Sequence, residues 1–332
     1  MAFRLRLSRV ASHVVTSCPV AFGPPDGPAT ADELALLKDV LMYNSPQITN
    51  VVATYPAQKT NLGLYNPWLT NWYCDNTLDC HYPEMGRTCG YAVTCIWGPP
   101  RDGYNRVSWI NVLKALEVNR ANGRPSALII KQDFPAEYAN KVGLVGGNMG
   151  AWGRKQPRNF PSEFSFDLRL LLPPLLLLHL DAANAMKVLG VCGCISDGPI
   201  RDLDELRELG MHMFSQGTSA GHGEMGVCEC PLLCRFATYL ILHRFVHADA
   251  VNVPVSVCGM DVAPGELVHM DENGVCKFPA DKLKLVVDNC KQLQAEEDDT
   301  LANVKQATNF KELMNAMAGR TPYDDGPDAD KK

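Results

Sequence analysis

The chain has 332 residues, of which 46% are hydrophobic and 20% are charged, so it is long enough to bury a substantial core as one or two domains. Its formal net charge of -6 gives no support to nucleic-acid binding through a basic surface. Its thirteen cysteines do not indicate a secreted disulfide framework, because the chain is long and carries no secretory signal. We interpret Cys192, Cys258, Cys276 and Cys290 as reduced core residues, since they stand in apolar patterns.

The first residues differ in kind from the rest of the chain. Arg4, Arg6 and Arg9 are interleaved with apolar and hydroxyl residues, and no acidic residue precedes Asp26. That composition is typical of an organellar transit peptide. We therefore expect residues 1–29 to be a transit peptide and linker and the protein to be mitochondrial. The alternative is an untargeted N-terminus on a cytoplasmic protein.

Periodicity predicts an alternation of helices and strands along the folded part of the chain. The expected helices are 31–43, 107–118, 203–209, 280–296 and part of 301–317, and the expected strands are 91–97, 126–131, 191–195 and 211–214. Residues 44–83 are expected to be ordered loop with short elements, 297–299 to end a helix, and 271–274 to form a turn with solvated acids. This alternation indicates an α/β protein.

The stretch from Val191 to Met225 holds the residues with the clearest chemistry. Arg201 and Asp202 follow its first strand and turn, and Asp202 stands where it can cap the next helix. A guanidinium offers a planar fork that suits a carboxylate, and a carboxylate is a hard ligand for Mg²⁺ or Mn²⁺. Together the two side chains could hold an α-keto acid through a metal. An N-cap aspartate beside a solvated arginine is the competing interpretation, and for an arbitrary Arg-Asp pair it is the better one.

Three blocks, 85–97, 191–225 and 251–279, resemble the RraA-like family, and the resemblance covers most of 31–294. That family includes 4-hydroxy-4-methyl-2-oxoglutarate aldolases, which also decarboxylate oxaloacetate, and regulators of ribonuclease E activity. Its pattern is a glycine loop, a short spacer, Arg-Asp, two residues and an acid. Arg201 and Asp202 followed by Glu205 match the end of this pattern.

A glycine loop, Gly146-Gly147-Asn148-Met149, is the second candidate for binding. Glycines let backbone amides approach an anion, although a lone Gly-Gly pair also suits a simple turn. The resemblance implies that Gly146, Gly147, Asn148 and Met149 form the substrate loop and that its amides hold the pyruvyl end. The family's usual aspartate, which orders a metal-bound water, is replaced here by Gly147, with Asn148 beside it. The group that transfers the proton is therefore left open.

Two further residues, His222 and Glu224, are candidates for proton transfer by residue type alone. They lie in the loop that follows the strand 211–214. The alternative is that both are ordinary loop residues bonded to backbone groups.

The spacing between the glycine loop and Arg201 is longer than the family pattern allows. Residues 150–182 make up the excess, and a second excess spans 227–247. Both segments are unlike the sequence on either side of them, and we interpret them as retained introns. Genuine surface insertions are the alternative. Neither is a convincing membrane span: 170–180 is too short and contains Pro173-Pro174, and 237–246 is shorter still and carries His243 and Arg244.

The resemblance implies a swivelling β/β/α domain over residues 30–295 as the single main domain, a helical or disordered tail over 296–332, and homotrimers. The implied activity is that of a divalent-metal-dependent lyase that cleaves a carbon–carbon bond next to a pyruvyl group and releases pyruvate. Its substrate, a small α-keto acid, would be 4-hydroxy-4-methyl-2-oxoglutarate for an aldolase or oxaloacetate for a decarboxylase. Asp202 would hold Mg²⁺ or Mn²⁺, and Arg201 would bind the substrate. We expect no nucleic-acid or membrane partner. The alternatives are a non-catalytic regulator of an RNA-processing enzyme and a chain inactivated by mis-splicing.

Overall fold

A computed structural model describes residues 25–55, 59–99, 104–105, 109–145, 182–221, 226–228 and 250–317, with backbone only at 104–105, 182 and 226–228. The glycine loop 146–149, the two excess segments apart from Ala182, Val227 and Cys228, and the two ends of the chain lie outside these residues.

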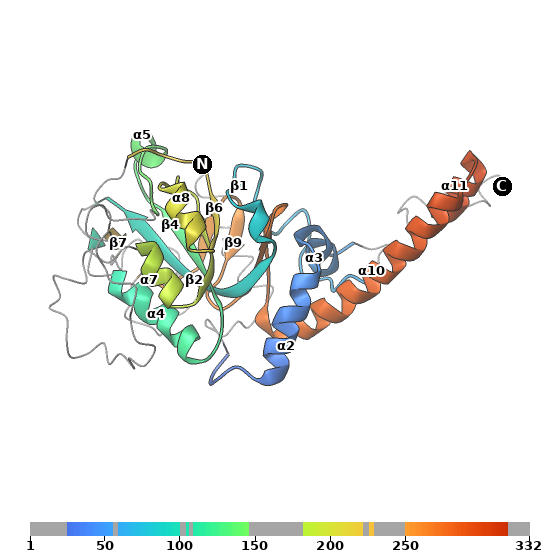
Figure 1. Cartoon of the computed structure of the whole chain (residues 1–332), viewed down its shortest axis with the longest axis horizontal. Coiled ribbons are helices and arrows are strands. Elements are labelled where there is room, and N and C mark those ends of the chain that lie inside the picture. Colours follow the sequence, from blue (N-terminus) through green and yellow to red (C-terminus); the bar gives the residue numbers. More distant parts are fainter. Residues whose placement is uncertain are drawn as a thin grey trace.

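The order of elements is that of a mixed α/β protein (Figure 1). The helices are α2 (Ala31–Asp39), α3 (Ser45–Val52), α4 (Trp109–Ala121), α5 (Ala136–Ala139), α7 (Ala182–Val188), α8 (Leu203–Glu208), α10 (Leu283–Gln306) and α11 (Phe310–Met317), with 3₁₀ turns at Val40–Met42, Pro83–Met85 and Ala280–Lys282. The strands are β1 (Asp79–Cys80), β2 (Thr88–Gly98), β3 (Tyr104–Asn105), β4 (Ser126–Gln132), β5 (Val191–Ser196), β6 (His212–Ser215), β7 (Gly226–Cys228), β8 (Val255–Val257), β9 (Met260–Val262), β10 (Leu267–Asp271) and β11 (Gly274–Phe278).

One twisted sheet organises the described residues, in the order β1-β6-β5-β4-β2-β10-β11. Its centre is parallel, because β2, β4, β5 and β6 all run in one direction. Its margins are antiparallel: β10 pairs with β2 and β11, and β1 pairs with β6. The carboxyl ends of the parallel strands therefore meet at one edge, where α/β proteins place binding sites.

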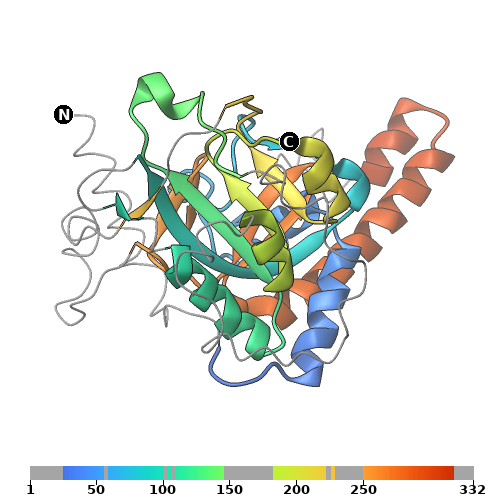
Figure 2. The same cartoon turned by 60° about the vertical axis from the view of Figure 1, so that its left-hand side comes forward.

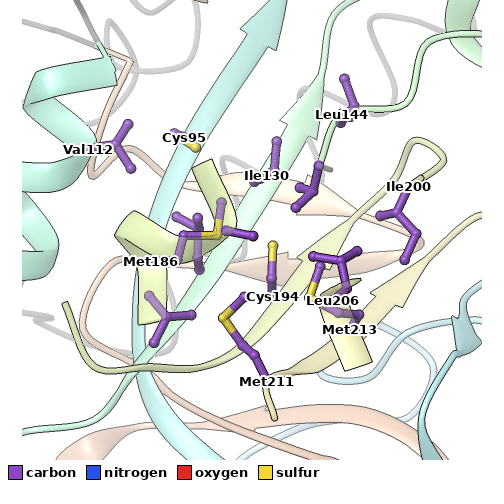
Figure 3. Packing of buried hydrophobic residues seen from close by; sticks show 14 of the residues in the cluster. Cys95, Val112, Ile130, Leu144, Met186, Cys194, Ile200, Leu206, Met211 and Met213 are labelled. Carbon is purple, nitrogen blue, oxygen red and sulfur yellow. The ribbon is translucent and has the colours of Figure 1, made fainter. Parts of the chain in front are cut away.

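Register explains why the central strands carry apolar side chains on both faces. Val93, Leu128, Cys194 and Met213 form one row across β2, β4, β5 and β6. These side chains belong to the core beneath α4 and α7, part of which Figure 3 shows. The adjacent row, which includes Phe214, belongs to a second core that contains the β8–β9 hairpin. Both faces of the sheet are buried, as expected for parallel strands.

A third core lies where α2, α3 and the first half of α10 pack on β10 and β11. In the view of Figure 2, this helical layer lies beside the sheet, and α10 leads away from it. Arg124, whose side chain is 2% exposed, pairs with Glu33 at 2.7 Å and fastens α2 to the loop before β4. Tyr91 donates a hydrogen bond of 2.6 Å to the same carboxylate.

The predicted fold class is confirmed, and every strand predicted in the sheet is present with small shifts of its ends. The prediction that residues 297–299 end a helix is wrong, because α10 continues to Gln306. Glutamate suits an exposed helical turn, and side-chain hydrogen bonds one turn apart support it: Gln292 donates to Glu296 at 3.0 Å, and Gln294 to Asp298 at 3.0 Å.

The long segment 44–83 contains α3, whose start is fixed by a capping box. Asn44 accepts a hydrogen bond from the Gln47 amide at 2.9 Å, and the Gln47 side chain accepts one from the Asn44 amide at 3.2 Å. The predicted turn at 271–274 joins β10 to β11, but Asp271 is fully buried and not solvated. Its carboxylate accepts hydrogen bonds from the amides of Ser45 and Asn273. Among the described residues, no helix is both long and apolar enough to cross a membrane.

Candidate functional site

Arg201 and Asp202 lie just beyond the carboxyl end of β5, between the sheet and α8. Asp202 has φ 59° and ψ 51°, the left-handed region that few residues other than glycine adopt. This conformation costs on the order of 1 kcal/mol, and such strain gathers at functional sites.

The left-handed backbone changes what the Asp202 carboxylate does. Asp202 occupies the N-cap position of α8, but its side chain makes no capping hydrogen bond, so the prediction that it caps this helix is wrong. An N-cap residue normally has extended backbone, which points its oxygen at the first turn of the helix. Asp202 instead accepts a hydrogen bond of 3.0 Å from Arg201 Nε, and the two side chains are 25% and 22% exposed.

Backbone hydrogen bonds hold the turn before Asp202 from two sides. On one side, the Arg201 amide donates to Val145 O at 3.0 Å, and the Leu144 amide donates to Pro199 O at 2.8 Å. On the other side, Ile200 bonds with the segment 217–219, through Gly217 O at 3.1 Å and the Ser219 amide at 2.9 Å. These contacts fix the backbone of Arg201 at the sheet edge, and the hydrogen bond to Asp202 orients its side chain.

Gly143 makes room for Arg201. A Cβ atom at this position would lie 3.0 Å from Arg201 Cγ and 3.0 Å from Gly221 O. The Gly143 amide also donates to Gly221 O at 2.9 Å. Since a side chain at position 143 would push against Arg201, glycine is needed here for the close approach of the two segments.

The pair has polar atoms that remain available to a ligand. Within the part of the chain that the structure describes, neither Nη of Arg201 nor Oδ1 of Asp202 has a hydrogen-bond partner. The guanidinium therefore presents its terminal nitrogens, and the carboxylate one oxygen, at a partly exposed edge. This is the donor and acceptor pair that an oxyacid and a hard cation require.

The helix that follows is anchored away from the pair. Tyr82 donates a hydrogen bond of 2.7 Å to Leu203 O, and burial raises the pKa of Tyr82 to about 12. Arg207 lies 5.1 Å from the centroid of the Tyr82 ring and pairs with Glu84 at 3.0 Å. Glu205 is exposed on the first turn of α8, and among the described residues its side chain bonds to neither Arg201 nor Asp202.

The remaining predicted site residues, Gly146, Gly147, Asn148, Met149, His222 and Glu224, lie outside the described residues. The described residues just before them are informative. Val145 precedes the glycine loop and accepts the hydrogen bond of the Arg201 amide. Gly221 precedes His222 and bonds to Gly143, which itself lies against Arg201. Val145 thus contacts Arg201 directly, and Gly221 is linked to it through Gly143.

An ion pair between Lys131 and Asp197 was not predicted as part of this edge. Lys131 lies near the carboxyl end of β4, and its Nζ donates to the Asp197 carboxylate directly after β5. The Gln132 amide donates to the other carboxylate oxygen at 2.6 Å, and Gln132 Nε2 donates to Asp197 O at 2.7 Å. Burial raises the pKa of Asp197, and the Lys131 charge opposes that shift. The signal was available, because a charged residue closes each of two apolar runs that pair in parallel.

The residues at this edge fit a divalent cation only if substrate and water supply most of its ligands. No group of three or more His, Cys, Asp or Glu side chains in the described ranges could enclose a metal ion. Mg²⁺ commonly binds through one or two carboxylates and keeps several waters or substrate oxygens. The open oxygen of Asp202 suits that mode and does not suit a closed structural site.

Part of the chain is similar in sequence to one protein family. Residues 181–276 match a family model described as RraA-like, Aldolase/RraA. An uncharacterised protein of Methanocaldococcus jannaschii is 23% identical over 129 residues, which is 39% of this chain and 52% of that protein. A putative 4-hydroxy-4-methyl-2-oxoglutarate aldolase of Halalkalibacterium halodurans is 27% identical over 113 residues, or 34% of this chain and 44% of that protein. The chain thus spans about half the length of the curated relatives that it matches.

A solved structure agrees on the fold. RraAS2 of Streptomyces coelicolor, described as an unusual member of the RNase ES inhibitor RraA protein family, superposes with a TM-score of 0.50 at 18% identity. The match covers 82% of this chain and 98% of that one. At this identity the likeness concerns the fold alone.

Proposed function

Because residues 181–276 are RraA-like and the fold is that of an RraA protein, we propose that this chain is a divalent-metal-dependent lyase that cleaves a carbon–carbon bond next to a pyruvyl group. The observation that carries the proposal is the Arg201–Asp202 pair, held in a strained turn with unused polar atoms at the sheet edge. The relative named as a putative aldolase supports this class of reaction.

Arg201 binds and orients the substrate. Its Nε is occupied by Asp202, so the terminal nitrogens are the ones that receive a substrate carboxylate. A guanidinium at this position also stabilises the negative charge that develops on the pyruvyl fragment as the bond breaks. Because main-chain hydrogen bonds hold the backbone of Arg201 and the bond to Asp202 orients its guanidinium, we expect little reorganisation to accompany that charge shift.

Asp202 is the residue that would hold Mg²⁺ or Mn²⁺ through its open carboxylate oxygen, with substrate and water oxygens as the other ligands. When bound, the cation supplies Lewis-acid polarisation of the keto oxygen. The contact with Arg201 keeps the carboxylate turned away from α8 and toward the ligand side. The amides of residues 147–149 are proposed to hold the remaining oxygens of the pyruvyl end.

Oxaloacetate is the substrate that this residue set suits best. In its decarboxylation the bond to the distal carboxylate breaks, carbon dioxide leaves, and the electron pair stays on the pyruvyl fragment until water protonates it. That sequence requires no strong base. Retro-aldol cleavage of 4-hydroxy-4-methyl-2-oxoglutarate requires a base that removes a hydroxyl proton, and the family resemblance implies that Gly147 replaces the family's usual aspartate. We therefore propose decarboxylation as the principal activity.

The N-terminal segment and the assembly complete the proposal. Residues 1–29, rich in arginine and free of acids before Asp26, are proposed to direct the protein to mitochondria. Fusion of these residues to a fluorescent protein tests this, and diffuse cytoplasmic fluorescence would contradict it. A homotrimer with the site near a subunit boundary is proposed from the family resemblance alone.

The test of the activity is pyruvate release from oxaloacetate by the full chain, with Mg²⁺ and then with chelator. Asp202→Asn removes the metal-binding charge, and Asp204→Asn is the matched control two residues along, on the exposed face of α8. We expect chelator-sensitive release that Asp202→Asn abolishes and Asp204→Asn keeps. Equal release by both variants, or none by the parent chain, would contradict the proposal.

A further inference from the structure

The carboxyl half of α10 and all of α11 form an arm, residues 294–317, that leaves the body of the protein (Figure 1). Leu293 is the last buried residue of α10, and no side chain from 294 to 317 is buried. The last contacts with α3 are those of Gln47 with Gln294 and Glu297. Beyond them, α11 lies against α10, and no hydrogen bond or ion pair among the described residues joins 298–317 to the body of the protein.

The arm nevertheless carries large apolar side chains at helical spacing. Phe310, Met314 and Met317 lie on one face of α11 and are 76%, 45% and 39% exposed. Leu301, on α10, is 53% exposed. α11 lies against α10, but a helix of eight residues is marginal in water, and packing on its exposed apolar face would stabilise it further. Exposed apolar side chains gathered in this way are typical of an interaction surface.

Charge along α10 indicates what covers the arm. Leu301 and Val304 lie on one face, and Asp298 and Lys305, seven residues apart, flank that face on the same side. When Leu301 faces Val304 of an antiparallel second copy, Lys305 lies beside Asp298 of that copy. By symmetry, Asp298 lies beside Lys305 of that copy. Parallel pairing would instead bring together the acidic runs 296–299. The arm is thus complementary to an antiparallel copy of itself.

We propose that the arm is a self-association surface, which pairs antiparallel with the arm of a second copy of this chain. The contact is isologous, since each residue pair occurs twice about the two-fold axis. Pairing of the arms doubles the number of chains in whatever oligomer the body of the protein forms. This surface is separate from the proposed lyase site, so neither proposal depends on the other.

Sedimentation velocity of the full chain over a range of micromolar concentrations tests the pairing. The chain should sediment as an even multiple of its mass, and Leu301→Glu with Met314→Glu should halve that mass. Asn303→Glu with Asn315→Glu is the matched control, because it adds the same charge to exposed polar positions of the same two helices. The control should keep the mass. Equal masses for the parent chain and the Leu301→Glu, Met314→Glu variant would overturn the proposal.

Charge reversal tests the identity of the occupant. Lys305→Glu should weaken association roughly tenfold, because two attractive pairs become repulsive. Adding Asp298→Lys to the same chain restores the attraction only when an antiparallel second copy is the occupant. Failure of the double variant to recover the affinity of the parent chain would show that another protein, another segment or another orientation covers the arm.

Discussion

The buried His269 makes the stability of this fold depend on pH. It lies on β10 with no exposed surface, and its Nδ1 is 3.0 Å from Ser45 Oγ. Burial disfavours the imidazolium and lowers the pKa of His269 to about 4, although the nearby Asp271 carboxylate opposes the shift and Arg87 reinforces it. An unfolded histidine titrates near 6.5, so the unfolded chain binds more protons between these values. The free energy of unfolding therefore falls as the pH drops through this window.

The two pKa values set the size of the effect. Linkage gives a loss of about 2 kcal/mol between pH 7 and pH 5 and about 3 kcal/mol by pH 4 from this one group. Urea denaturation followed by circular dichroism at pH 7 and pH 5 measures it. His269→Gln removes the titration, so its stability should fall by about 2 kcal/mol less than that of the parent chain over this interval. His81→Gln, the same change at a half-buried histidine, should keep most of the pH dependence. A His269→Gln chain with the full pH dependence of the parent would refute the reasoning.

Three substitutions test the packing around the sheet and the site. Gly143→Ala places a Cβ 3.0 Å from Arg201 Cγ, so kcat/KM for oxaloacetate should fall by about tenfold while the urea midpoint moves little; unchanged kinetics would contradict the close approach. Phe214→Ala empties a fully buried position on β6, in the core that contains the β8–β9 hairpin, and should cost about 3–5 kcal/mol in urea unfolding; a loss below 1 kcal/mol would contradict that burial. Glu266→Gln leaves the 6% exposed Lys277 ammonium unpaired and should cost about 3 kcal/mol, whereas an unchanged midpoint would show that the pair is solvated.

Strand prediction succeeded because the central strands are buried on both faces. Residues 127–130, for example, are all apolar and are bounded by polar residues, and a run that short is consistent with a parallel strand covered on both faces. Helix ends were harder to place. The acidic residues 297–299 suggested a break, but nothing in the sequence showed that this part of α10 leaves the body and is free to be polar.

The roles that sequence reasoning missed depend on contacts between residues far apart in the sequence. Asp271 belongs to a turn whose composition suggests solvated acids, yet it is buried because Ser45, at the start of α3, donates its amide to it. That contact spans more than two hundred residues, so no local pattern encodes it. Lys131 and Asp197 likewise end two separate strands and meet only once β4 and β5 pair.

Sequence reasoning identified the residues of the candidate site but did not predict their geometry. Residue type and order singled out Arg201 and Asp202, and local sequence favoured Asp202 as a helix cap. Its left-handed backbone follows from hydrogen bonds that Val145 and Gly217 make with the preceding residues. Those partners lie on other segments of the sheet edge. The strain at Asp202, and with it the release of its carboxylate from the helix, is therefore a property of the tertiary structure.

Direct binding of Mn²⁺ to the full chain, followed by electron paramagnetic resonance, tests the central claim that Asp202 holds the metal of a lyase site. We predict saturable binding that Asp202→Asn removes and Asp204→Asn keeps, with a change in the bound Mn²⁺ signal when pyruvate is added. Equal Mn²⁺ binding by the two variants would contradict the account, because the metal would then lie away from the Arg201–Asp202 pair.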